Sequence, residues 1–310
     1  MSRNLAVGVD LGGTHLSSGL VDIDSLEVLE NSTTRSSYDH KADSDQILNN
    51  WTNNIEKTIS YKKDNDKVLG IGIAMPGPFQ YKTGISKMQQ KMVSLYDKHI
   101  PTELNARLNS SKDYTFRFIN DATCFAIGES LIGKGQGMSK IVVLTLGTGF
   151  GSAFLENTIP IITRPDTPPE GCLWHLNFKE GIGDNYFSTQ WFVERYNEIN
   201  QKKISGVKEL LSDEEAQQYV EEIMSEFGKN LGDFVGPWLK TFDAEILILG
   251  GNISKAVDYF ILPLKDSLST QHIEIQIATS KIMEASAIIG SAKLFDKDFW
   301  PLVSATVPMI

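Results

Sequence analysis

The sequence predicts an α/β fold made of two similar halves. The chain has 310 residues, of which 41% are hydrophobic, and this length is too great for most single cores. Three strands joined by short turns, followed by alternating helices and strands, occur twice along it. We therefore expect two domains, each a mixed sheet with helices on both faces, and a ligand cleft between them.

The first half is predicted from apolar runs and from one helical period. Ile47, Trp51, Ile55 and Ile59 recur every fourth residue and give the helix over 43–60 one buried face. Apolar runs bounded by glycine, proline or polar residues predict the strands. The expected strands are 5–9, 18–23, 28–34, 68–74 and 116–119; the expected helices are 43–60 and 122–131, and 79–100 is expected to be an ordered loop with some helix.

The second half repeats this order with insertions. The tail after 295 has no clear period. We place the first lobe at 1–121 plus about 290–310, and the second lobe at 122–289. The expected strands of the second half are 141–146, 152–155, 159–163, 245–249 and 273–278, and the expected helices are 185–198, 207–211, 213–241, 253–268 and 284–295.

Composition and charge argue against several classes of partner. The net charge is −10, the pI is about 5.1 and basic runs are missing, which argues against nucleic acid or an anionic membrane. The sequence contains no run of about 18 apolar residues, so no segment is expected to span a bilayer. The chain starts almost directly on a strand and has only Cys124 and Cys172. We therefore expect a cytoplasmic, reduced protein without a four-thiolate zinc site.

Two glycine turns carry the strongest functional signal. When Gly13-Thr14 is placed on Gly147-Thr148, the flanks agree: an apolar run before the turn, then small residues, two apolar residues and an acid. A glycine–threonine turn between strands offers backbone N–H groups and a hydroxyl to an anion. An ordinary hairpin turn is the alternative for either copy alone. The pair predicts a duplicated fold that binds one phosphate chain from both sides, and hence a phosphotransferase; the candidate phosphate-binding residues are Gly12, Gly13, Thr14, Gly147, Thr148 and Gly149.

Three further positions complete the candidate site. Asp10 ends a buried strand beside the first turn, where its carboxylate can hold Mg²⁺ directly or through water. Asp121 lies where a strand meets a helix, which is also a typical helix N-cap position; its carboxylate can accept a proton from a sugar hydroxyl that attacks a γ-phosphate. The glycines in Gly250-Gly251-Asn252 open a helix after a strand, where a purine or a phosphate can pack on the backbone, although close strand packing alone also explains them.

In their order along nearly the whole chain, these motifs resemble the ROK family of sugar kinases, in the actin–hexokinase superfamily. Gly72–Pro78 looks like the family's G-x-x-x-P-G-P segment, and Gly128-Glu129 accompanies the catalytic motif. The resemblance implies two ribonuclease-H-like domains and ATP with Mg²⁺ as cofactors. It implies a hexose of glucose-like or N-acetylhexosamine type as the acceptor. Homodimers are common in that family, so the resemblance also implies a homodimer as a possible oligomeric state.

The same resemblance assigns roles to individual residues. Asp121 would be the general base and Asn120 a sugar ligand. The glycines of both turns would hold phosphates, and Asp10 would balance the charge of Mg²⁺. The run from Leu249 to Ile253 looks like the family's adenosine motif.

The chain departs from the family in the sugar-binding motif. Typical members carry Gly-Glu-x-Gly-His, whereas this chain has Gly171-Cys172-Leu173-Trp174-His175. His175 is kept as a sugar ligand, but Cys172 stands at the Glu position. The zinc-binding cysteines that should follow are missing from 177–183, so no zinc site is expected. The family's later sugar-binding Glu becomes Asp184, whose shorter side chain moves the hydrogen bond.

Two alternatives stay open. Polyphosphate glucokinases also lack the cysteine cluster and carry a Leu-Thr-Leu-Gly-Thr-Gly turn like 144–149, so the donor is ATP or polyphosphate. The Cys172 substitution also suits a sugar- or nucleotide-binding sensor with weak catalysis. ROK repressors add an N-terminal helix-turn-helix, for which we see no room before Leu5.

Overall fold

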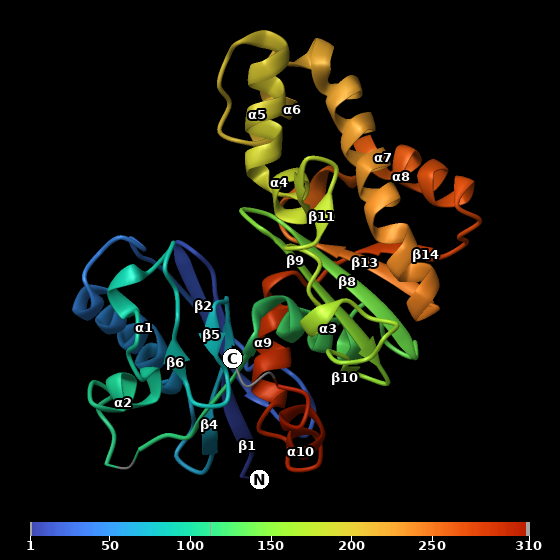
Figure 1. Ribbon diagram of the computed structural model, residues 1–310. Helices are drawn as coiled ribbons and strands as arrows, with labels where there is room; N and C mark the ends of the chain where they lie inside the picture. Colours follow the sequence, from blue (N-terminus) through green and yellow to red (C-terminus); the bar gives the residue numbers. More distant parts are fainter. Residues whose placement is uncertain (1, 112, 308–310) are drawn as a thin grey trace. The chain divides into compact units, whose positions relative to one another are not determined.

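The computed structural model describes residues 2–111 and 113–307. The chain divides into two compact units, of which unit 1 comprises Met1–Gln136, Thr158–Pro160 and Ile282–Ile310, and unit 2 comprises Gly137–Asn157 and Ile161–Lys281. Five-stranded sheets dominate the architecture (Figure 1). Each unit is described by itself below.

The sheet of unit 1 has the strand order β3-β2-β1-β4-β7. Strand β1 runs antiparallel to β2 and parallel to β4, and β4 runs parallel to β7. This mixed pattern is the one that the sequence predicts. The strands are β1 (Asn4–Leu11), β2 (His15–Asp22), β3 (Thr34–Ser37), β4 (Lys67–Met75) and β7 (Phe116–Asn120).

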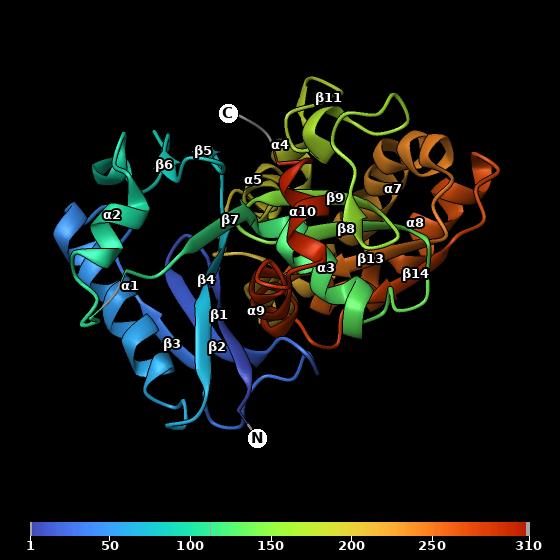
Figure 2. The same ribbon diagram turned by 90° about the horizontal axis from the view of Figure 1, so that it is seen from below.

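Helices cover both faces of this sheet, because successive side chains of a strand point to opposite faces. Val7 packs in one cluster with Trp51 of α1, whereas the neighbouring Ala6 packs in another with Ile288 of α9. Figure 2 shows α1 and α9 on opposite sides of β1, β2 and β4. The helices of unit 1 are α1 (Ser44–Ile59), α2 (Ile100–Asn105), α3 (Asp121–Ile132), α9 (Glu284–Lys293) and α10 (Phe299–Ser304).

Helix α9 packs so closely on β1 and α3 that its backbone contacts theirs at glycine positions. A Cβ at Gly8 of β1 would lie 1.9 Å from the Ile288 carbonyl oxygen, and one at Gly128 of α3 would lie 2.0 Å from that of Ser286. Only glycine permits such an approach. The predicted lobe boundaries at 121/122 and near 290 therefore differ from the compact units: all of α3 and α9 lies in unit 1, since these two helices pack on each other and on its sheet.

The second sheet has the order β10-β9-β8-β13-β14. Strand β8 is antiparallel to β9 and parallel to β13, and β13 is parallel to β14. The pairing of the first sheet is thus repeated, which confirms the predicted duplication. The strands are β8 (Lys140–Leu146), β9 (Phe150–Glu156), β10 (Ile159–Pro160), β13 (Ile246–Gly250) and β14 (Gln276–Thr279).

The long helix α7 forms the centre of the unit 2 core. Its Phe227 and Leu231 pack in one cluster with Leu144 and Leu249 of the sheet. Helix α8 runs beside it (Figure 1). The helices of unit 2 are α4 (Gly183–Phe187), α5 (Thr189–Asn200), α6 (Val207–Ser212), α7 (Gln217–Phe242) and α8 (Val257–Thr270). The short strands of the chain are β5 (Phe79–Gln80), β6 (Ile85–Ser86), β11 (Asn177–Phe178) and β12 (Gly181–Ile182). Its 3₁₀ helices are η1 (Val93–Leu95), η2 (Pro169–Gly171) and η3 (Ile253–Ala256).

Several expected elements differ from the structure. The strand expected at 28–34 is misplaced: Val28 forms only an isolated bridge with Val21, and the third strand is β3, which shares just Thr34 with the expected range and pairs with β2. The helix expected at 185–198 is divided at Ser188, whose backbone is extended. Helix α7 starts at Gln217 rather than 213. Helix α10 occupies part of the tail for which no period was seen.

Candidate functional site

The first glycine turn joins β1 to β2. The hairpin is closed by a bond from the Gly12 N–H to the His15 carbonyl at 2.9 Å. The Tyr38 hydroxyl donates to the Gly12 carbonyl at 2.5 Å, and its backbone N–H donates to the Thr14 carbonyl at 3.0 Å. A Cβ built at Gly13 would meet nothing within 4 Å. The turn is therefore held by Tyr38 and has open space at Gly13.

The second glycine turn joins β8 to β9 and is held in a similar way. The Gly147 N–H donates to the Gly149 carbonyl at 3.1 Å. The Gly147 carbonyl accepts two bonds from Thr189, one from its N–H at 2.7 Å and one from its hydroxyl at 2.9 Å. Space beside Gly147 is again open within 4 Å. Both turns thus leave a glycine uncovered, as an anion nest requires.

The two turns differ in length by one residue. The last strand pair before the first turn is Leu11 with Leu16, and the last pair before the second is Leu146 with Phe150. Matching Gly13-Thr14 with Gly147-Thr148 therefore aligns the outgoing strands correctly. The incoming strands are shifted by one residue, so Asp10 corresponds to Thr145.

Asp10 lies among charged groups at the end of β1. Burial, followed by the negative charges of Asp121 and Glu284, raises the pKa of Asp10 to about 7, and the positive charge of Arg35 opposes this shift. Glu284 forms an ion pair with Arg35 and accepts a hydrogen bond from the Ser17 hydroxyl at 3.0 Å. Three neighbouring carboxylates with one nearby Arg favour a bound cation, so Asp10 fits a role in holding Mg²⁺.

His15 lies over the first turn. A Cβ at Gly12 would be 2.9 Å from the His15 ring, and His15 Nε2 is 3.9 Å from Glu284 Oε1. Burial and the charge of Arg35 lower the pKa of His15. Glu284, Arg35 and Tyr38 carry no signal in the sequence pattern. The structure places Arg35 at this site through its pairing opposite Ser17 in the β2–β3 hairpin.

Asn120 and Asp121 lie where β7 passes into α3. Asn120 is the N-cap, and its side chain accepts from the Thr123 N–H at 3.3 Å. The Asn120 side-chain amide also donates to the Tyr81 hydroxyl at 3.4 Å. Asp121 is the first helical residue, and its Oδ1 accepts from the Ala122 N–H at 2.9 Å. The cap role that competed for Asp121 therefore belongs to Asn120.

Asp184 lies against the second glycine turn. Its Oδ1 accepts from the Phe150 N–H at 2.8 Å and would be 3.4 Å from a Cβ at Gly149. The Asp184 N–H donates to the Trp174 carbonyl at 2.9 Å, and the ring of Trp174 packs edge-on against His175 at 5.2 Å. Asp184 and His175, both expected to bind sugar, thus belong to one local structure in unit 2.

The third motif packs on the end of β8. Gly251 has a φ of 79°, and a Cβ there would lie 2.3 Å from the Leu146 carbonyl oxygen. Gly250 pairs with Thr145 in the sheet. Asn252 accepts a hydrogen bond from Lys255 at 2.9 Å. Gly251 therefore allows the backbone to pack closely on Leu146. Since Leu146 is the last residue of β8, this contact places the motif next to the start of the second glycine turn.

The candidate residues fall into two groups. Unit 1 holds Asp10, Gly12, Gly13, Thr14, Asn120 and Asp121, and unit 2 holds Gly147, Thr148, Gly149, His175, Asp184, Gly250, Gly251 and Asn252. Within the part of the chain that the structure describes, no three His, Cys, Asp or Glu side chains gather into a metal site of their own. Cys124 is buried and Cys172 is partly exposed, and the Cys172 thiol donates to the Glu170 carbonyl at 3.4 Å.

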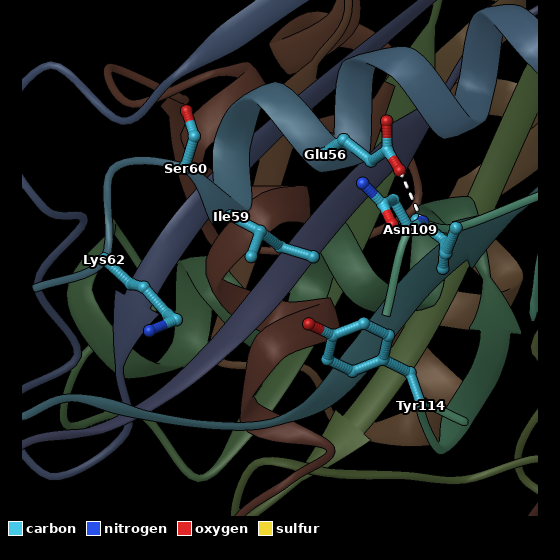
Figure 3. Close-up of a pocket in the computed structure, with 7 residues that line it drawn as sticks. Glu56, Ile59, Ser60, Lys62, Asn109 and Tyr114 are labelled. Carbon is cyan, nitrogen blue, oxygen red and sulfur yellow. Dashed lines mark hydrogen bonds between the residues drawn. The ribbon is translucent and has the colours of Figure 1, made fainter. Parts of the chain in front are cut away.

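A pocket of about 390 Å³ lies at the end of α1 (Figure 3). Glu56, Lys62 and Tyr114 line it, and the Glu56 carboxylate accepts from the Asn109 N–H at 2.6 Å. It includes none of the motif residues, so it is separate from the candidate site. None of the helices in residues 2–111 and 113–307 combines the length and apolar character needed to cross a bilayer.

Solved structures share the fold of this chain. A ROK family glucokinase from Streptomyces griseus in complex with glucose and AMPPNP has a TM-score of 0.66 at 19% identity, covering 94% of this chain and 98% of that one. An inorganic polyphosphate/ATP-glucomannokinase from Arthrobacter sp. has a TM-score of 0.68 at 22%, with coverages of 94% and 98%. A ROK family transcriptional regulator, a homologue of E. coli MLC protein, has a TM-score of 0.77 at 18%, with coverages of 98% and 81%. These similarities establish the actin/hexokinase-like fold.

Sequence comparisons agree with the fold. A glucokinase of Thermotoga maritima is 25% identical over 327 residues, covering 95% of this chain and 98% of its own. An N-acetyl-D-glucosamine kinase of Histophilus somni is 26% identical over 326 residues, covering 93% and 98%. The model of the ROK family matches residues 6–298. The chain therefore belongs to the ROK family.

Proposed function

We propose that this chain is an ATP-dependent sugar kinase that transfers a phosphoryl group to a hydroxyl of a hexose, either glucose-like or an N-acetylhexosamine. The observation that carries the proposal is the repeated sheet with an open glycine turn at the same place in each copy. The relatives named as glucokinase and N-acetyl-D-glucosamine kinase support it, because both are phosphotransferases that act on sugars.

Asp121 is the general base of this proposal. Its Oδ1 is fixed by the Ala122 N–H, which orients the carboxylate at the start of α3. The proton of the sugar hydroxyl moves to Oδ2 while the hydroxyl oxygen attacks the γ-phosphorus. A bond forms between that oxygen and phosphorus, the bond to the β–γ bridging oxygen breaks, and ADP leaves.

The two turns and Asp10 hold the donor. Backbone N–H groups of Gly13, Thr14, Thr148 and Gly149 bind phosphate oxygens, while the N–H groups of Gly12 and Gly147 close the two turns. Gly250-Gly251-Asn252 holds the adenosine. Mg²⁺ would be held by Asp10, directly or through water, and would neutralise phosphate charge. The surplus negative charge around Asp10 supports this assignment.

Asn120, His175 and Asp184 orient the acceptor. Asn120 neighbours the base in sequence, and its side chain is held by Thr123 and Tyr81. In unit 2, Asp184 is joined to the second turn and to the loop that carries His175. Hydrogen bonds to several hydroxyls place one of them for attack, and such positioning contributes to the rate of phosphoryl transfer together with electrostatic stabilisation.

A coupled assay over a panel of hexoses, with ATP–Mg²⁺ or polyphosphate as donor, tests the proposal. We expect turnover with ATP on at least one glucose-like sugar or N-acetylhexosamine. Turnover with polyphosphate but not with ATP would show that polyphosphate is the phosphoryl donor. Sugar binding without turnover on any member of the panel would overturn the kinase in favour of the sensor that the Cys172 substitution suggests.

A further inference from the structure

We propose that Trp174 forms an aromatic wall of the acceptor site and selects pyranoses whose ring face is free of axial hydroxyls. This inference rests on the proposed sugar-binding function of the unit 2 residues. It adds a specificity-determining residue that the motif pattern does not contain. Trp174 is carried by the loop between η2 and β11.

Trp174 differs from the other tryptophans in its exposure. The chain has five, and Trp174 alone is among the exposed large hydrophobic residues, with 45% of its surface accessible. Trp51, for comparison, is 1% exposed. An indole left in water gives up a large apolar burial, and exposed aromatic rings are enriched where proteins bind ligands.

The loop that carries Trp174 is fixed on both sides. Leu173 is completely buried, and its N–H donates to the Ser152 hydroxyl at 2.9 Å. That hydroxyl in turn donates to the Gly171 carbonyl at 2.8 Å. On the other side, the Trp174 carbonyl accepts from the Asp184 N–H. The backbone beneath the exposed ring is therefore rigid, and a preorganised wall loses little entropy on binding.

One polar side chain suited to sugar hydroxyls packs against the ring, and a second belongs to a residue bonded to the same loop. His175 packs edge-on against it at an interplanar angle of 70°. Asp184, bonded to the backbone of Trp174, reaches the second glycine turn with its carboxylate. An apolar ring beside an imidazole, on a loop bonded to Asp184, matches the two kinds of surface on a pyranose: C–H groups on its faces and hydroxyls around its edge.

This arrangement also selects among hexoses. In β-glucopyranose every hydroxyl is equatorial, so both ring faces present only C–H groups. Galactose, the 4-epimer, carries an axial hydroxyl on one face and keeps C–H groups on the other, so the wall disfavours galactose only where it meets the first face. An uncharged indole cannot replace a carboxylate in binding hydroxyls, so a site with Cys172 and Trp174 gains affinity by apolar contact.

The test compares Trp174→Ala and Trp174→Phe with Tyr259→Ala, a matched control because Tyr259 is an aromatic residue of unit 2 that is 52% exposed. The readouts are KM and kcat for glucose, galactose and ATP, and the Kd of glucose by calorimetry. We expect Trp174→Ala to weaken glucose binding roughly three- to tenfold and to leave the KM for ATP unchanged. Trp174→Phe restores most of the loss, and Tyr259→Ala has no effect.

The inference and the proposed function fail separately. If the wild type binds glucose without turnover and Trp174→Ala weakens that binding, the kinase assignment fails and the wall stands. If the wild type phosphorylates glucose and Trp174→Ala changes neither the KM nor the Kd for glucose, the aromatic wall is overturned. An equal loss in Trp174→Ala and Tyr259→Ala would also overturn it, because a general effect on unit 2 would then explain the result.

Discussion

The Ser291 hydroxyl oxygen on α9 accepts a hydrogen bond from the backbone N–H of Val9 at 3.1 Å, and both groups are buried. The same hydroxyl donates to the Ile288 carbonyl one turn earlier in the helix at 3.0 Å. Val9 precedes Asp10, so this bond ties the strand end that carries the candidate metal-binding carboxylate to the helix behind it.

Replacing Ser291 by Ala leaves the Val9 N–H without its partner. A buried donor without an acceptor costs about 1–3 kcal/mol, so we expect Ser291→Ala to lower the free energy of unfolding by that amount. Urea denaturation measures it, with Ser269→Ala on the exposed face of α8 as control. Equal stabilities of the two variants would show that the bond contributes nothing.

Gly13→Ala should separate binding from folding. A Cβ at Gly13 meets nothing within 4 Å, so the protein should fold with an unchanged melting temperature. The methyl group would fill space assigned to a phosphate oxygen, and we expect the KM for ATP to rise roughly tenfold or more. An unchanged KM would remove Gly13 from the phosphate site.

Gly290→Ala, in contrast to Gly13→Ala, should destabilise the folded protein. A Cβ there would lie 1.9 Å from the Cys124 carbonyl oxygen, which belongs to the backbone of α3 and cannot move alone. We expect a loss of more than about 3 kcal/mol in the free energy of unfolding. Thermal denaturation measures this loss, and a Gly290→Ala protein as stable as Gly13→Ala would contradict the close packing of α3 on α9.

The raised pKa of Asp10 predicts a stability that depends on pH. The carboxyl has a pKa of about 7 in the folded protein against an ordinary value of 3.8, so its ionisation opposes folding. This penalty is absent below pH 4 and grows as the pH rises from 4 to 7. Without Mg²⁺, the melting temperature of Asp10→Asn should therefore be higher than that of the wild type at pH 8 and equal to it at pH 4. The same difference in melting temperature at both pH values would contradict the raised pKa of Asp10.

Much of the fold, including the position of both glycine turns of the candidate site, could be predicted from local patterns. The two turns and the strands on either side of them are marked by glycine between apolar runs, and both were located correctly. The third strand was misplaced because Val28 and Leu29 form an apolar pair that resembles a strand, whereas β3 is short and polar. The extra residue in the first turn escaped notice because only strand pairing reveals it.

The surroundings of Asp10 could not be predicted, since they depend on tertiary contacts. Arg35 and Glu284 are 249 positions apart and meet only because α9 returns to the sheet of the first unit. Tyr38 reaches Gly12 across the β2–β3 hairpin. None of these contacts follows from a periodicity or a motif.

The general base is tested most directly by the kcat of Asp121→Asn on the best sugar of the panel, with folding checked by thermal denaturation. Asparagine keeps the shape of the side chain but cannot take the proton, so we expect kcat to fall by about 10²–10⁴-fold while the melting temperature stays close to that of the wild type. A folded Asp121→Asn protein that retains the wild-type kcat would contradict the assignment of Asp121 and, with it, the mechanism.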